Sequence, residues 1–440
     1  MNKKLRCGLI GMPLGHSYSP EIHALLADYE YTLTELEENE VGSYLKSDRF
    51  DATNVTIPYK KTVMPFLDEI SPEAERIGSV NTITHLPDGR LRGDNTDYYG
   101  FSHLLDTAGI DVKDRIVVII GGGGASMTAR TVAADRGAKE VRILTHKENT
   151  PENLPKFADA EILMNTSPVG MYPKNGESPV PMDLFPNLIG VVDMVYNPSK
   201  TALILDAEER KIPCISGLPM LVAQAKMASE LFTGTKIPDD VLAFVTRRVQ
   251  MTKKNITLVG MPGSGKSTIG RALAQLTGRE FIDLDDYITE KAGMPIPEIF
   301  AKHGEPYFRD LETACLEEVS KLSGMVLSMG GGTPVRPGNR RMIRQNSTVI
   351  FLKRDLTLLP KDGRPVSQAN DLTRLYEVRR PFYEEVSEYE IDVRPSAEDN
   401  AKHIIEVLGL RNFSSQTAHI RICWASASLP STADRILRLC

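Results

Sequence analysis

Short apolar runs, each followed by a polar or glycine-rich loop and then by a helix-like segment, recur along the chain. The clearest runs lie at residues 5–11, 115–120, 141–145, 256–260 and 349–352. Uninterrupted apolar strands are typical of parallel sheets whose two faces are covered by helices. The pattern therefore predicts an α/β fold. No run is long and apolar enough to cross a membrane.

The transition at residues 256–276 has the pattern of a phosphate-binding loop. A strand-like run leads into Gly260-Met-Pro-Gly-Ser-Gly-Lys-Ser-Thr268, and a helix-like run follows. Glycines let several backbone N–H groups and a helix N-terminus face one anion. In such loops the lysine, here Lys266, reaches the β- and γ-phosphates, and the serine, here Ser267, binds Mg²⁺. The predicted ATP contacts are Gly263, Ser264, Gly265, Lys266, Ser267 and Thr268.

Charged side chains follow this loop in positions that suit phosphoryl transfer. Asp283 is placed to support Mg²⁺ near Ser267, and Asp285 to accept the proton of a substrate hydroxyl. Acids at the end of a strand also serve as helix caps, so this alternative stays open. Arg309 offers a positive charge, and Gly330–Gly332 lets backbone approach a ligand. The residues alone indicate a small P-loop kinase that acts on an anionic alcohol.

Polar side chains in the first hundred residues stand at the ends of successive predicted strands and helices. In open α/β sheets, ligands bind at such positions. The set suits a small polyhydroxylated acid, with a lysine free to act in proton transfer. Simpler roles are a helix start at Ser19-Pro20 and a solvated surface position for the lysine. The set consists of Ser17, Ser19, Thr56, Lys60, Asn81 and Asp97.

A second glycine-rich loop follows the apolar run 115–120. Gly121 and Gly123 match G-x-G, Ser126 occupies the third, small position, and a helix of small residues comes next. This order predicts a Rossmann-type dinucleotide-binding fold. After the next strand, Lys147 could face a 2′-phosphate, whereas Glu148 lies one or two residues beyond the usual ribose-binding acid. The pattern favours NADP over NAD.

Length, charge and cysteine usage limit the number of domains, the classes of partner and the cellular location. A chain of 440 residues should hold two or three domains, and a net charge of −6 does not favour nucleic-acid binding. The cysteines show neither C-x-x-C nor metal-ligand spacing, which indicates reduced thiols and a cytoplasmic location. We therefore expect small-molecule partners, with no nucleic acid and no membrane. The oligomeric state does not follow from the sequence.

The motifs of the first 250 residues resemble those of the shikimate dehydrogenase family. They are Gly11-x-Pro-x-x-His-Ser-x-Ser-Pro20, Asn54-Val-Thr-x-Pro-x-Lys60, Val80-Asn-Thr82 and Gly93-Asp-Asn-Thr-Asp97. The resemblance implies reduction of 3-dehydroshikimate to shikimate, with Lys60 and Asp97 as the catalytic pair. The substrate-binding residues that it implies are Ser17, Ser19, Thr56, Lys60, Asn81, Asp97, Tyr196 and Gln224.

The same resemblance implies NADP(H) as the cofactor. The family's Asn-Arg-Thr is replaced here by His146-Lys147-Glu148, and the segment 149–160 is shorter than the family's. Both departures leave the choice between NADP and NAD open. The cofactor contacts that it implies are Gly121, Gly123, Gly124, Ala125, Ser126, Thr145, His146, Lys147, Met194 and Gly217.

The segment from about 253 to 410 resembles shikimate kinase. The matching motifs are the phosphate-binding loop, Asp283-x-Asp285, Phe308-Arg309, Gly330-Gly-Gly332, Arg364-Pro365 and Arg379-x-Pro-x-Tyr383. The resemblance implies that Arg309 and Arg379 bind the shikimate carboxylate, a task suited to bidentate donors. It assigns Asp285 and Gly330–Gly332 to the substrate, Ser267 and Asp283 to the metal, and Arg364 to a lid over ATP. Lys266, Asp285 and Arg364 are then the catalytic residues.

We predict four segments: a substrate-binding domain (1–105, completed by helices in 217–250), an NADP-binding Rossmann-type domain (106–216), a P-loop kinase domain with a parallel sheet (251–410) and a poorly ordered tail (411–440). The short polar joint at 249–255 predicts halves that are closely tethered without a fixed interface.

The predicted function is a bifunctional enzyme of aromatic biosynthesis that uses NADPH, ATP and Mg²⁺ to make shikimate and then shikimate 3-phosphate. One alternative is a quinate/shikimate dehydrogenase that prefers NAD, fused to the kinase. Another is a non-catalytic sensor of shikimate-pathway metabolites. The presence of Lys60, Asp97, Lys266, Ser267, Asp283 and Asp285 argues against the sensor.

Overall fold

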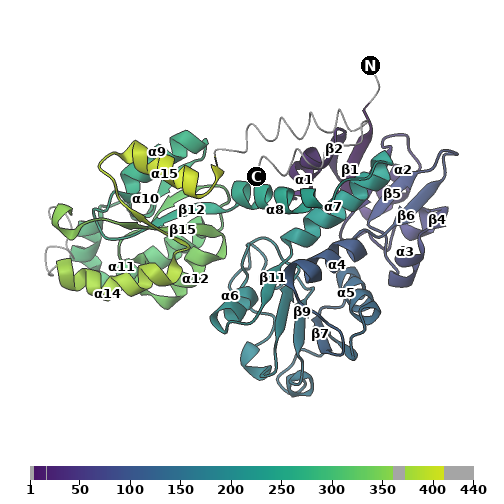
Figure 1. Cartoon of the computed structure of the whole chain (residues 1–440), viewed down its shortest axis with the longest axis horizontal. Helices are drawn as coiled ribbons and strands as arrows, with labels where there is room; N and C mark the ends of the chain where they lie inside the picture. Colours follow the sequence, from purple (N-terminus) through teal and green to yellow (C-terminus); the bar gives the residue numbers. More distant parts are fainter. Residues whose placement is uncertain (1–3, 16, 360–371, 411–440) are drawn as a thin grey trace.

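A computed structural model describes residues 4–15, 17–359 and 372–410 and contains three β-sheets, each with its own helices (Figure 1). We call them the first, second and third units in chain order. The predicted α/β fold is confirmed. Arg364 and the tail from Arg411 lie outside the described residues.

The first unit is built on a mixed six-stranded sheet of order β2-β1-β3-β5-β6-β4. Its strands are β1 (Arg6–Gly11), β2 (Glu30–Glu35), β3 (Ala52–Val55), β4 (Glu69–Ile70), β5 (Thr82–His85) and β6 (Leu91–Asp94). Its helices are α1 (Ser19–Leu26), α2 (Val41–Leu45), α3 (Pro72–Ile77), α4 (Asp97–Ala108), α7 (Leu218–Thr233) and α8 (Asp240–Lys253). The apolar faces of α1, α7 and α8 pack together around Ile22, Val222 and Val245.

The second unit has a wholly parallel sheet of order β11-β10-β9-β7-β8. Its strands are β7 (Ile116–Ile120), β8 (Glu140–Leu144), β9 (Ile162–Asn165), β10 (Gly190–Asp193) and β11 (Cys214–Ser216). α5 (Gly124–Asp135), together with α4, covers one face, and α6 (Ala202–Glu209) covers the other. Both faces of β7 are therefore apolar, as its uninterrupted run of Ile and Val requires.

The third unit also has a wholly parallel sheet, of order β13-β14-β12-β15-β16. Its strands are β12 (Asn255–Val259), β13 (Phe281–Asp283), β14 (Val326–Ser328), β15 (Ser347–Lys353) and β16 (Tyr389–Asp392). α9 (Lys266–Thr277) and α15 (Ala397–Val407) cover one face. α10 (Leu284–Ala292), α11 (Ile296–Ser320), α12 (Pro337–Gln345) and α14 (Leu372–Val386) cover the other.

Polar side chains mark the ends of several strands. Asn81 immediately precedes β5, and Thr56 lies just beyond β3. β13 ends at Asp283, the first residue of the acidic run, because Asp283 caps α10 and Asp285 lies in the first turn of that helix.

The joint between the halves is helical and not a loop, since α8 runs to Lys253 and β12 begins two residues later. The expected lack of a fixed interface is wrong. Arg341 of α12 forms an ion pair with Asp206 of α6 at 2.5 Å. Gly324 N, just before β14, donates to the carbonyl of Lys253 at the end of α8 at 2.9 Å. The third unit thus contacts both other units (Figure 1). Over the described ranges, no helix has the length and apolar character needed to cross a membrane.

Candidate active sites

Lys60 and Asp97 form an ion pair at the carboxyl edge of the first sheet. Lys60 lies in the turn after β3, Asp97 is the first residue of α4, and Lys60 Nζ is 2.5 Å from Asp97 Oδ2. The side chains are 21% and 10% exposed. Partial burial removes competing water, so the carboxylate holds the ammonium in one orientation while leaving it accessible.

Asn81 and Gln224 belong to one hydrogen-bond network that passes through Thr96. Thr96 N donates to Asn81 Oδ1 at 2.8 Å, and Asn81 Nδ2 donates to Thr96 Oγ1 at 3.0 Å. The Thr96 hydroxyl also lies 3.3 Å from Gln224 Oε1 on α7. All three residues are buried, and the network fixes two predicted substrate residues beside Asp97.

The two predicted serines and Thr56 lie at the ends of β1 and β3. Ser17 Oγ accepts a hydrogen bond from Ser19 N at 3.2 Å, at the start of α1. The Thr56 methyl lies so close to Gly11 that any side chain there would collide with it. Because β1 and β3 are parallel neighbours, these residues end at the same edge of the sheet as Lys60.

Tyr196 comes from the second unit and faces the first. Its ring centroid is 5.1 Å from that of Tyr18, which lies beside Ser17 and Ser19. Tyr196 therefore lies at the boundary between the two units, against the residue that separates Ser17 from Ser19.

The glycine-rich loop after β7 fits a bound phosphate. Gly121 has a φ of +127°, and a Cβ there would lie 2.5 Å from Thr166 Oγ1. Gly123 is the N-cap of α5, and Gly124, Ala125 and Ser126 form its first turn. The Ser126 hydroxyl is buried, and among the described residues it has no hydrogen-bond partner. These N–H groups and the helix N-terminus favour an anion.

Met194 and Gly217 touch at the ends of β10 and β11. A side chain at Gly217 would overlap the carbonyl of Met194, so only glycine permits this approach. Gly217 N donates to the carbonyl of Val195 at 3.1 Å. Both residues lie at the same carboxyl edge of the sheet as the glycine-rich loop, Met194 one strand and Gly217 two strands beyond β9.

At the end of β8, Glu148 folds back toward the strand. Its Oε2 accepts hydrogen bonds from Thr145 Oγ1 at 2.7 Å and Thr145 N at 3.1 Å, which lower the pKa of the carboxyl. His146 and Lys147 are exposed. Glu148 is one or two residues later in the sequence than the usual ribose-binding acid, but the turn returns its carboxylate to the end of β8.

The third unit holds a cavity of about 500 Å³ at the carboxyl edge of its sheet. The phosphate-binding loop forms one wall, and the glycines after β14 form another. The cavity is lined by Gly263, Gly265, Lys266, Ser267, Thr268, Asp283, Asp285, Arg309, Gly330, Gly331, Gly332, Arg354 and Arg379, among others. Except for Ser264 and the undescribed Arg364, all the predicted kinase residues meet here.

The loop itself is shaped for an anion. Lys266 Nζ donates to the carbonyls of Gly260 and Met261 at 3.0 Å each. Gly263 and Gly265 have φ values of +82° and +98°, which L side chains rarely adopt. The buried Ser264 hydroxyl has no hydrogen-bond partner in the described part of the chain. This donor set fits nucleotide phosphates.

Ser267, Asp283 and Asp285 are adjacent at the mouth of this loop. Ser267 Oγ donates to Asp283 Oδ2 at 2.6 Å, and Asp283 Oδ1 accepts from Asp285 N at 3.0 Å. Asp283 thus combines the predicted metal position with the alternative role of a helix cap. A serine hydroxyl and a carboxylate are oxygen ligands of the kind that Mg²⁺ prefers.

The carboxylate of Asp285 lines the cavity, but the protein atoms around it exclude much of the water. Reduced hydration, reinforced by the negative charge of Asp283 and opposed by Lys266, raises the pKa of Asp285 to about 6. A carboxylate with this pKa is a stronger base than an ordinary aspartate, which suits it to accept a proton near neutral pH.

Two arginines face the glycines across the cavity. Arg309 Nη1 lies 2.9 Å from Glu312 Oε2, and a Cβ at Gly332 would lie 2.6 Å from Arg309 Nη1. Arg379 is only 6% exposed, and Tyr383, one turn later, donates to the carbonyl of Gly331 at 2.5 Å. The arrangement can bind a small carboxylate between two guanidinium groups.

Comparisons with known proteins match both halves of the chain. The family model of the shikimate dehydrogenase substrate binding domain matches residues 9–83. Shikimate dehydrogenase (NADP(+)) of Clostridium beijerinckii is 37% identical over 246 residues, which are 51% of this chain and 90% of that protein. The chain belongs to the shikimate dehydrogenase family.

The second half of the chain matches a different family model. The shikimate kinase model matches residues 262–409, so both resemblances drawn from the motifs are confirmed.

Solved structures give the same result for the dehydrogenase. A chorismate mutase/shikimate 5-dehydrogenase fusion protein from Clostridium acetobutylicum aligns with a TM-score of 0.54 and 31% identity, covering 57% of this chain and 98% of that one. Shikimate Dehydrogenase 1 from Peptoclostridium difficile aligns with a TM-score of 0.51 and 35% identity, covering 55% and 97%.

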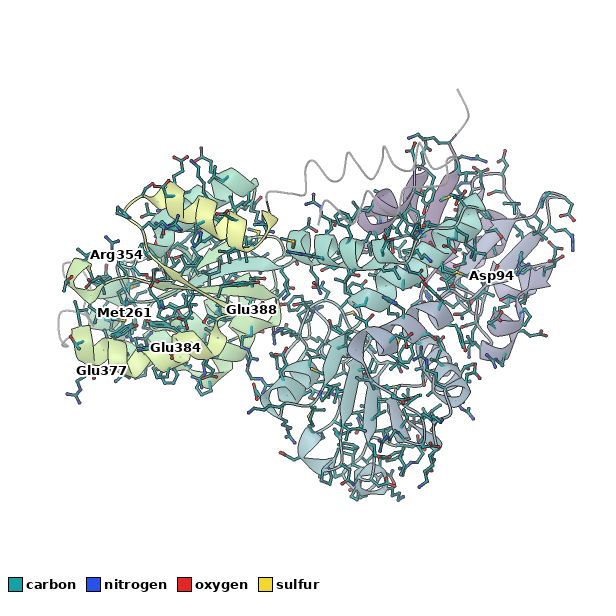
Figure 2. All side chains as sticks on the ribbon, viewed as in Figure 1. Asp94, Met261, Arg354, Glu377, Glu384 and Glu388 are labelled. Atoms are coloured by element: carbon teal, nitrogen blue, oxygen red, sulfur yellow. The ribbon has the colours of Figure 1, made fainter. Side chains whose placement is uncertain are left out.

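Sequence reasoning missed three residues of this dehydrogenase–kinase chain. Thr96 joins Asn81 to Gln224, and Glu312 holds Arg309. Arg354, labelled in Figure 2, belongs to the third unit and lines its cavity. Glu312 could have been found as a buried acid three residues after Arg309 on one helix. Arg354 directly follows β15, so its place at the carboxyl edge was also accessible from the strand pattern.

Asp285 should give the kinase a distinctive pH dependence. As a proton acceptor it must be ionised, so with a pKa of about 6 we expect kcat/KM to fall as pH decreases through that value. Asp285→Asn should abolish most kinase turnover at every pH. Dehydrogenase activity of the same samples is the control, and a pH-independent kinase rate between pH 5 and 7 would contradict this role.

Glu148 should oppose binding of a 2′-phosphate. Its carboxylate at the end of β8 repels a second negative charge, so Glu148→Gln should raise the ratio of kcat/KM with NADPH to that with NADH by about tenfold. Lys147→Ala, a neighbouring exposed change, should lower the ratio. An unchanged ratio in Glu148→Gln would show that the carboxylate does not face the cofactor.

Proposed function

We propose that this chain catalyses two consecutive reactions: NADPH-dependent reduction of 3-dehydroshikimate to shikimate, and ATP- and Mg²⁺-dependent phosphorylation of shikimate to shikimate 3-phosphate. The observation that carries the proposal is the Lys60–Asp97 ion pair at 2.5 Å inside a cluster of hydroxyl and amide side chains. Such a cluster suits a hydroxylated acid that exchanges a proton with a lysine.

In the dehydrogenase, the residues of the first unit bind and orient the substrate. Ser17, Ser19, Thr56, Asn81 and Gln224 would hydrogen-bond its carboxylate and hydroxyls, with Tyr196 at the boundary. Lys60 would donate its proton to the C3 oxygen and recover one from solvent, while Asp97 keeps the ammonium in place. NADPH, when bound, supplies the hydride.

The choice of NADPH is supported by the printed name of the Clostridium beijerinckii relative and by the exposed Lys147. The loop from Gly121 to Ser126 would hold the pyrophosphate, and Thr145, His146 and Lys147 would line the adenosine end. Met194 and Gly217 would lie at the nicotinamide end. The position of Glu148 is the one observation that favours the alternative, an NAD-preferring quinate/shikimate dehydrogenase.

In the kinase, Arg309 and Arg379 would bind the carboxylate of shikimate, and Gly330–Gly332 would pass close beneath its ring. Asp285 would accept the proton of the 3-hydroxyl as that oxygen is phosphorylated. Lys266 and the N–H groups of the loop would stabilise charge on the phosphates. ATP supplies the phosphoryl group, and Ser267 and Asp283 would hold Mg²⁺.

The proposed function predicts that a single substitution in one site abolishes one reaction and leaves the other unchanged. Lys60→Met should lower the rate of NADPH oxidation with 3-dehydroshikimate by at least about 10²-fold, the usual contribution of a positioned acid/base. Its rate of ADP formation with shikimate and ATP should stay normal. Lys266→Met should give the opposite pattern.

Each variant serves as the folding control for the other reaction. Loss of both reactions in either single variant would contradict two separate sites. A purified native chain that shows neither reaction would favour the metabolite sensor.

A further inference from the structure

All three units meet at three tyrosines, Tyr18, Tyr172 and Tyr196, which we call the tyrosine junction. Tyr18 precedes α1, whereas Tyr172 and Tyr196 lie on the loops after β9 and β10. The rings of Tyr18 and Tyr196 are 5.1 Å apart. Tyr172 N donates to the carbonyl of Asn197 at 3.1 Å, so the two loops of the second unit are joined.

The kinase contacts both sides of this junction. The Tyr172 hydroxyl donates to the carbonyl of Ser320, at the end of α11, at 2.8 Å. Burial and the neighbouring Tyr196 raise the pKa of Tyr18 to about 12, while a hydrogen bond with Ser323 opposes this rise. Residues 320–323 of the third unit are therefore packed against Tyr172 and Tyr18 of the junction.

Gln345, the last residue of α12, binds the two loops directly. Its carbonyl accepts hydrogen bonds from Ser199 Oγ and Lys200 N, each at 2.9 Å. Its side-chain Oε1 accepts from Asn175 Nδ2 at 2.7 Å. Carbonyls at a helix C-terminus have no partner inside the helix, so the loops satisfy a group that would otherwise need water.

An ion-pair network supports these hydrogen bonds. α6 carries Asp206, Glu208 and Glu209 near its C-terminus, where the helix dipole disfavours negative charge. Arg341 pairs with Asp206 at 2.5 Å and with Glu209 at 3.3 Å, and Arg344 pairs with Glu208 at 2.9 Å. The arginines of α12 supply the cations that this end of α6 requires.

We propose that the kinase is a positioning element of the dehydrogenase, holding the loop at 195–200 so that Tyr196 faces the substrate. The inference rests on the proposed function, in which Tyr196 contacts shikimate. A loop without regular hydrogen bonds keeps one conformation only when neighbouring groups hold it. Tyr172 and Gly217 of the second unit hold the first half of this loop, at Asn197 and Val195. Gln345 holds its second half, at Ser199 and Lys200, and the arginines of α12 hold the helix that follows it. Gln345 and these arginines belong to the other enzyme.

Charge reversal at the interface tests this inference. Arg341→Glu places a third carboxylate beside Asp206 and Glu209, which should loosen the loop. We expect the KM for shikimate in the NADP⁺-dependent oxidation to rise about tenfold, with a smaller change in kcat. Combining Arg341→Glu with Asp206→Arg should restore the KM. Kinase turnover should stay normal and reports that the third unit is folded.

A matched control is Arg210→Glu at the end of the same helix. Arg210 pairs with Asp183 inside the second unit at 2.6 Å, so its reversal should leave the KM unchanged. Tyr172→Phe removes only the hydrogen bond to Ser320 and should raise the KM by a smaller factor. It supplies the test if Arg341→Glu does not fold.

Failure of this inference and failure of the proposed function give different results. An unchanged KM in both Arg341→Glu and Tyr172→Phe, or a charge swap that does not restore the KM, would overturn the positioning role. Lys60→Met that still oxidises shikimate at the native rate would overturn the proposed dehydrogenase function itself.

Discussion

Parallel strands end at the same edge of a sheet, and both candidate sites depend on this constraint. It brings Lys60 to Asp97 in the first unit, and it brings the phosphate-binding loop to the glycines after β14 in the third. At such edges, backbone N–H groups and helix N-termini face the ligand and share the binding of anionic groups with charged side chains. In the third unit, the charged side chains of the cavity stand at this same edge.

In each site, a buried or half-buried carboxylate holds a cation toward the cleft. Asp97 holds Lys60, and Glu312, which is 1% exposed, holds Arg309. The low local dielectric strengthens these pairs relative to exposed ones. Asp285 differs because reduced hydration, reinforced by the negative charge of Asp283 and opposed by Lys266, raises its pKa to about 6. In the proposed function, one fold class thus provides a fixed proton donor in one half and a proton acceptor of raised pKa in the other.

Most of the site could be predicted from sequence because its residues lie in short motifs whose local structure is set by glycines, caps and strand ends. The phosphate-binding loop and the Lys60 motif are examples. The position of Glu148 could not, since it depends on how one turn folds back onto Thr145. The pairing of Arg341 with Asp206 joins residues 135 positions apart, and no local pattern identifies it. The fixed interface could therefore not be predicted, because it is formed by residues that are far apart in the sequence.

The central claim is that one chain carries out two consecutive reactions. The most direct measurement follows purified protein supplied with 3-dehydroshikimate, NADPH, ATP and Mg²⁺, and quantifies shikimate 3-phosphate, NADP⁺ and ADP. We expect shikimate 3-phosphate, NADP⁺ and ADP to form at equal rates once the concentration of shikimate is constant. NADPH oxidation without shikimate 3-phosphate, or no dependence of its formation on NADPH, would contradict it.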